Sequence, residues 1–128
     1  MPTDNTPTEV HEIQIPAREY KVACQVASRI GRAASGNAIV IKFMERTMAK
    51  WGEDDPKVEV LAKYLKMARD AGSPHKFNLR LPVPMCDTIR KAVANLPPDW
   101  SFEQTVEALV QWSMEDMRTT GPLQGRHF

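Results

Sequence analysis

Three polar side chains near the middle of the chain alternate with apolar ones. Lys76, Asn78 and Arg80 are each followed by an apolar residue, and Pro82 ends the alternation. A period of two predicts a β-strand with its polar side chains on one face. Lysine and arginine can donate to guanine, and asparagine can pair with adenine. The three residues are therefore candidates for reading base edges, and a solvated edge strand is the alternative interpretation.

A similar but less basic segment lies near the start of the chain. Glu12 and Gln14 alternate with apolar residues there, and Pro16 ends the run. Glutamate can accept from cytosine and glutamine can pair with adenine, so both are added to the base-reading candidates. Because one short strand leaves its backbone groups unpaired, the two segments are expected to pair as an antiparallel ribbon, which fits the major groove. The apolar face of this ribbon would comprise Ile13, Ile15, Phe77, Leu79 and Leu81.

The remainder of the chain shows helical periodicity, so the fold class is mostly α. Ser35 and Ser101 are suited to cap the helices that follow them. Apolar residues recur at helical spacing, as in the stripe Val106, Val110 and Met114. The helices are expected at about 17–30, 36–51, 56–70, 83–95 and 102–117.

The order of these elements repeats. Strand, helix and helix occur twice, and one further helix separates the two sets. The distance from Pro16 to Ser35 is 19 residues, and the distance from Pro82 to Ser101 is the same. This spacing indicates two tandem copies. The expected organisation is a disordered segment at 1–9, copy one at 10–52, a linker helix at 53–74, copy two at 75–118 and a tail at 119–128.

Copy two resembles a known family of DNA-binding proteins. The segment K-F-N-L-R-L-P is similar to the strand of the Arc and Mnt phage repressors, and the serine cap and apolar spacing of the last helix are also similar. The resemblance implies a ribbon-helix-helix fold, here with two copies forming an intrachain pseudo-dimer, and repression through operator binding. It places Lys76, Asn78 and Arg80 at the base-reading positions and Ser101 at a phosphate contact. The loop at 95–100 is longer than in Arc and lacks its Gly-Arg pair.

Residues beside the ribbon are candidates for contacts with the DNA backbone. The N-termini of the second helices, at Ser35 and Ser101, offer free backbone N–H groups to phosphates. Arg32 follows a glycine as it does in Arc, and His75 directly precedes the basic strand. All four residues are expected to flank the base-reading side chains.

Composition neither requires nor excludes a nucleic-acid partner. The net charge of the 128 residues is +1, although residues 11–52 hold seven Lys/Arg against three Asp/Glu. No catalytic motif is present, so we expect neither an enzyme nor a cofactor. Two separated cysteines and three histidines do not form a metal-binding pattern. Without a signal peptide or a long apolar run, the expected location is the cytoplasm, at the nucleoid. Glu103 and Glu107 are expected to be solvated on the last helix.

Two alternatives remain open at this stage. In the first, only 75–118 is a ribbon-helix-helix unit that forms a homodimer, and residues 10–70 bind a protein partner, as in an antitoxin or autoregulator. In the second, the same fold acts as a phage-encoded inhibitor that occupies a protein complex. Self-association on a long DNA site is expected under the repressor interpretation.

Overall fold

The computed structural model describes residues 7–30, 35–51 and 57–120. The predicted fold class is confirmed at the level of a mostly helical chain with one small antiparallel sheet. No helix in these ranges has the length and hydrophobicity needed to cross a membrane. The described elements are β1 (Thr8–Pro16), α1 (Ala17–Ile30), α2 (Gly36–Met48), α3 (Val58–Asp70), β2 (Pro74–Pro82), α4 (Val83–Val93) and α5 (Phe102–Thr120).

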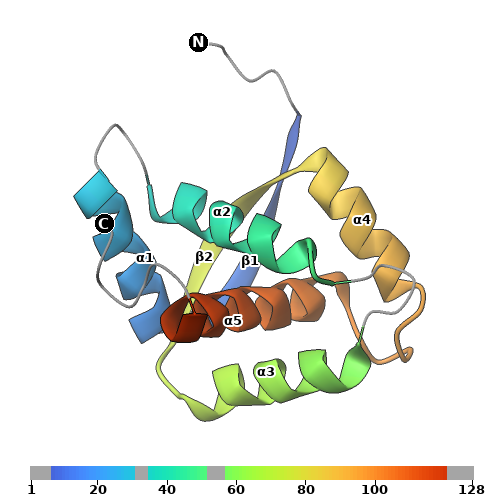
Figure 1. Cartoon of the computed structure of the whole chain (residues 1–128). Helices are drawn as coiled ribbons and strands as arrows, with labels where there is room; N and C mark the ends of the chain where they lie inside the picture. Colours follow the sequence, from blue (N-terminus) through green and yellow to red (C-terminus); the bar gives the residue numbers. More distant parts are fainter. Residues whose placement is uncertain (1–6, 31–34, 52–56, 121–128) are drawn as a thin grey trace.

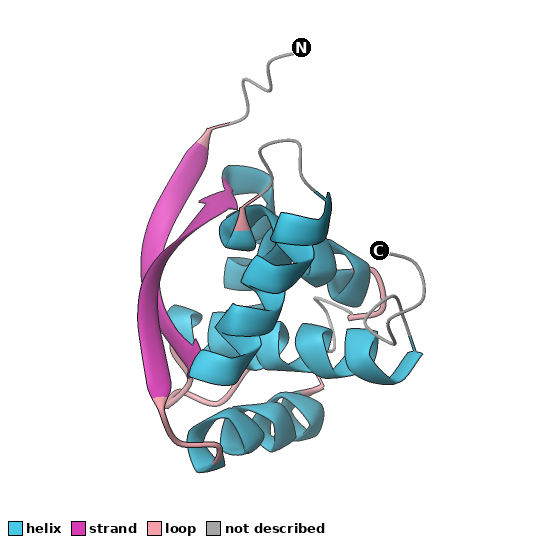
Figure 2. Cartoon of the chain, turned by 90° about the vertical axis from the view of Figure 1, so that its left-hand side faces the viewer, coloured by secondary structure: helices cyan, strands magenta, loops and turns pink. Residues whose placement is uncertain are grey.

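The two strands pair with each other within the single chain, as predicted. β1 and β2 are antiparallel, and the register runs from Thr8 opposite Pro82 to Pro16 opposite Pro74. We refer to this pair as the ribbon. Figure 2 shows the ribbon along one side of the molecule and the helices on the other side. One face of the ribbon is therefore covered by helices and the other faces solvent.

The covered face of the ribbon forms part of the hydrophobic core. Ile13, Ile15, Leu79 and Leu81 are buried, and Phe77 is partly buried against them. Helix α5 crosses this face (Figure 1) and contributes the predicted apolar stripe. Alternation along the strands thus sends every second side chain into the core, which leaves the intervening ones on the outward face.

The two halves of the chain have matching element positions. The same offset of 66 residues separates the first residues of β1 and β2, of α1 and α4, and of α2 and α5. Each strand leads directly into a helix at the residue after its last proline. The order strand, helix, helix is therefore repeated with the same spacing up to the start of the second helix.

Several boundaries differ from those expected from the sequence. β1 begins at Thr8 rather than Val10, because contacts beyond the ribbon extend the strand: the N–H of Val83 donates to the carbonyl of Pro7 at 3.0 Å, and Glu9 pairs with Arg90. Thr8 and Glu9 therefore belong to the sheet and not to a disordered segment. Helices α2 and α4 end a few residues earlier than expected, at Met48 and Val93.

Glu107 was expected to be solvated, and this expectation is wrong. It is buried, and its two carboxylate oxygens have different partners. One oxygen accepts from the backbone N–H of Gln14 at 2.7 Å, and the other accepts from the guanidinium of Arg69 at 2.7 Å. The carboxylate therefore connects α5 with β1 and α3. Helix α3 also packs on α5 through the stacked rings of Tyr64 and Trp112, whose centroids are 5.8 Å apart.

We predict that Glu107→Ala lowers the free energy of unfolding by about 2 kcal/mol, because a charge-assisted hydrogen bond is lost and the Gln14 N–H is left without an acceptor. Glu107→Gln is the matched control, since its amide oxygen can still accept from Gln14, and it should cost less. Urea unfolding followed by circular dichroism measures both. Equal losses for the two variants would show that the bond to Gln14 contributes little.

Candidate nucleic-acid interface

The outward face of the ribbon carries the polar row predicted for β2. Lys76, Asn78 and Arg80 are exposed, while the alternating Leu79 is fully buried. This arrangement follows from the period of two in the strand, since burial of one set of side chains forces the other set outward. The three predicted side chains therefore lie together on one accessible surface.

β1 contributes a second row to the same face. Val10 and Glu12 are exposed, and Gln14 is half-buried. Val10 is 49% exposed, which is high for an aliphatic side chain on a strand. The register places Val10 opposite Arg80, Glu12 opposite Asn78 and Gln14 opposite Lys76. We call these six residues the outward face. It carries two cations, one carboxylate, two amides and one apolar side chain.

Both outer edges of the ribbon are fixed by side chains from the second helices. The backbone N–H of Arg80 donates to Asn37 Oδ1 of α2 at 3.0 Å. At the matching position of β1, the backbone N–H of Gln14 donates to Glu107 of α5. Neither bond involves the side chain of the strand residue. The edges are thus held in place while the outward side chains stay available.

Arg80 is oriented by a contact across the ribbon. Its Nη1 lies 3.3 Å from Thr8 Oγ1. An arginine has five N–H donors, so this contact leaves most of the guanidinium free. The planar group is therefore held over the outward face with donors remaining for a ligand such as guanine or phosphate.

The predicted serine caps are confirmed as helix caps. Ser35 Oγ accepts from the N–H of Ala38 at 3.1 Å, and Ser101 Oγ accepts from the N–H of Gln104 at 3.0 Å. The N–H of Ser101 in turn donates to Gln104 Oε1, which completes a capping box. These bonds fix where α2 and α5 begin, and they leave the other N–H groups of each first turn for a phosphate, which stays a prediction.

The two remaining phosphate candidates are placed differently. Arg32 lies outside the described residues. His75 alternates with the outward row and is half-buried on the helix side of the strand. Its ring stacks on that of Tyr20 with centroids 4.5 Å apart. The structure therefore groups His75 with the packing of α1 on β2 rather than with Lys76, Asn78 and Arg80.

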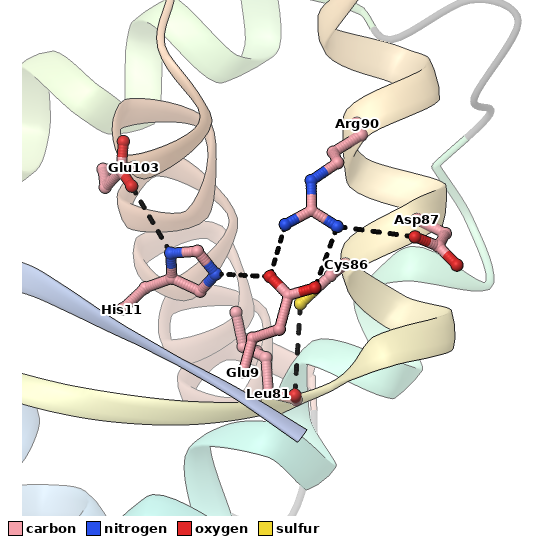
Figure 3. A network of polar contacts seen from close by, with 7 residues as sticks. All are labelled: Glu9, His11, Leu81, Cys86, Asp87, Arg90 and Glu103. Carbon is pink, nitrogen blue, oxygen red and sulfur yellow. Dashed lines mark hydrogen bonds and ion pairs between the residues drawn. The ribbon is translucent and has the colours of Figure 1, made fainter. Parts of the chain in front are cut away.

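A polar network lies at the matching position on the other strand. Figure 3 shows Arg90 of α4 donating to both carboxylate oxygens of Glu9. The ring of His11 is 2.9 Å from Glu9 and 3.4 Å from Glu103 of α5. Hydrogen bonds from Arg90 and then His11 hold the pKa of Glu9 at about 2. The network therefore ties β1 to both helices of the second half.

The same cluster contains three atoms of metal-ligating types. Glu9, His11 and Cys86 each offer one, and these lie within 4.8 Å of one another. Burial, and then the charge of Glu9, raises the pKa of the Cys86 thiol to about 11. A metal ion would have to deprotonate this thiol and displace the guanidinium of Arg90 from Glu9. The geometry fits an ion-pair clamp better than a metal centre.

Sequence reasoning missed the residues that support the outward face. Asn37, Glu107, Glu9 and Arg90 all act through contacts between segments far apart in the chain. Only Asn37 carried a local signal, as a polar residue in the first turn of a helix. The others are polar residues on helices or at a strand end, and such residues are usually solvated.

Comparison with known proteins found no matching family model, no matching curated protein and no matching solved structure. The site is therefore interpreted from its own geometry.

The low pKa of Glu9 predicts a pH-dependent contribution to stability. A carboxylate whose pKa is lowered on folding stabilises the native state above its unfolded value, here near 4.5, and the contribution is lost as the pH falls towards about 2. Glu9→Gln should therefore be less stable than the unaltered chain at pH 7, and the difference should vanish near pH 2.

Thermal unfolding from pH 7 to pH 2 measures this difference. Glu45→Gln is the control, because Glu45 is exposed on α2 and its replacement should change stability by no more than about 0.5 kcal/mol. A difference between Glu9→Gln and the unaltered chain that stays constant down to pH 2 would contradict a stabilising ion pair with Arg90.

Proposed function

We propose that the chain is a sequence-specific DNA-binding transcriptional regulator whose ribbon enters the major groove. The observation that carries this proposal is the exposed row of Lys76, Asn78 and Arg80 on a ribbon whose other face is buried. A two-stranded ribbon has the right width for the groove. Occupation of an operator by the ribbon would exclude other proteins from that site, and repression follows.

The finer fold in this proposal is a pair of ribbon-helix-helix units that form a pseudo-dimer within one chain. The constant offset of the elements supports it, as do the matching edge contacts of Asn37 and Glu107. Pairing of β1 with β2 in the same chain supplies the strand partner that an ordinary dimer takes from a second subunit. Helix α3 then serves as the covalent link between the units.

The side chains of the outward face suit recognition of bases. Arg80 and Lys76 can donate to O6 and N7 of guanine, and Asn78 and Gln14 can pair with adenine. Glu12 can accept from the exocyclic amine of cytosine. Phosphates on either side would be held by the first turns of α2 and α5, beside Ser35 and Ser101, and by Arg32.

Substitutions on the outward face test base reading. With a duplex selected from a random pool, Arg80→Ala and Asn78→Ala should each weaken binding by about 1–3 kcal/mol, and by much less with a scrambled duplex. Lys66→Ala removes one positive charge from an exposed position on α3 and is the control for charge alone. Gel shifts at several salt concentrations measure these effects. Equal losses on both duplexes would exclude base reading, and log K should fall by about 0.9 per phosphate contacted for each decade of salt.

A protein-binding role is the second candidate function, and one observation favours it. Val10 is exposed beside Glu12, and an apolar and an acidic side chain are common in protein interfaces but unusual next to phosphates. In this alternative the outward face binds a protein, as in an antitoxin or a phage-encoded inhibitor. Failure to shift any duplex at low salt, with loss of a protein partner on Val10→Asp, would favour it.

The association state separates the pseudo-dimer from a homodimer built on residues 75–118. Because the ribbon is complete within one chain, we expect a folded monomer at low protein concentration. Native mass spectrometry, combined with circular dichroism at the same concentration, measures this. An obligate dimer that unfolds on dilution would favour the homodimer and would argue against pairing of β1 with β2 in solution.

A further inference from the structure

We propose that the ribbon reads a duplex without palindromic symmetry and binds it in a single orientation. This inference rests on the proposed function. It concerns the class of DNA site, and it follows from the register of the two strands and from the chemical difference between them.

The register places the pseudo-twofold axis at the centre of the outward face. The offset of 66 residues that relates the two halves carries Glu12 onto Asn78, and these residues also lie opposite each other in the ribbon. The axis therefore passes between them. In a homodimeric ribbon the two residues at this point would be identical, and the two halves of a bound operator would be related by the same axis.

None of the three pairs of equivalent positions on the outward face holds the same residue type. The offset relates Val10 to Lys76, Glu12 to Asn78 and Gln14 to Arg80. An apolar group thus stands where the other half has a cation, a carboxylate where it has an amide, and an amide where it has a guanidinium. A base that suits one half does not suit the other.

The pairs across the ribbon give the expected order of contacts. At one end Arg80 lies opposite Val10, which suits a guanine next to a thymine methyl group. Asn78 and Glu12 at the centre suit an adenine and a cytosine. At the other end Lys76 lies opposite Gln14, which suits a guanine and an adenine. The orientation of the chain on the DNA is fixed because the two ends are not interchangeable.

The asymmetry lies in the side chains and not in the backbone of the ribbon. Asn37 and Glu107 hold the edges through the backbone N–H groups of Arg80 and Gln14, which any side chain leaves in place. Exchanging outward residues should therefore change the DNA sequence that is read while keeping the support for the strands.

Selection of bound duplexes from a random pool by the unaltered chain is the first test. Enrichment of a motif whose halves differ supports the inference. Inverting one half of that motif, so that it becomes a palindrome, should then weaken binding at least about tenfold. Enrichment of a palindrome would overturn the inference and leave the proposed function standing. Recovery of no duplex would overturn the proposed function together with the inference.

The second test makes the two halves equal. The triple variant Val10→Lys, Glu12→Asn, Gln14→Arg carries the side chains of β2 on both strands, and it should prefer a palindrome built from the half-motif read by Lys76, Asn78 and Arg80 by at least about tenfold over the original motif. Circular dichroism establishes that it is folded. A folded triple variant that keeps the original preference would overturn the inference. The mirror variant Lys76→Val, Asn78→Glu, Arg80→Gln is the control and should lose this palindrome.

Discussion

The pairing of β1 with β2 is the interaction on which the rest of the structure depends. Neither strand can satisfy its backbone groups alone, and each would expose its apolar side chains without the helices of both halves beneath it. Pairing brings together segments that are far apart in the sequence, with Glu12 opposite Asn78 at the centre. It also fixes which side chains face the core, because a slip of one residue would turn every side chain to the other face.

Polar side chains of the helices then hold this ribbon in place. Asn37 and Glu107 contact equivalent backbone groups at its two outer edges, and the pair of Glu9 and Arg90 joins the start of β1 to α4. An exposed strand edge is a template for unwanted pairing with other chains, so these contacts also protect the monomer. They are made on the helix side or with the backbone, which leaves the outward side chains free for a ligand.

The two halves share their architecture but have different chemistry. A shared backbone with unlike side chains is what a single chain permits and a homodimer does not, since the two copies can be altered independently. Arg69 of α3 reaches Glu107 on one half only, and the ion-pair network around Glu9 occupies the position where the other half stacks His75 on Tyr20. The proposed reading of an asymmetric duplex follows from the same independence.

The sequence alone determined the elements and the faces of the strands. Alternation placed Lys76, Asn78 and Arg80 opposite the buried Leu79 and Leu81, and the serines marked the starts of α2 and α5, because these signals are local and depend only on neighbouring residues. Tertiary structure decided the register, the burial of Glu107 and the partners of Glu9 and Asn37. Those features depend on contacts between distant segments, and a glutamate on a helix has the same local signal whether it faces water or a backbone N–H across the core.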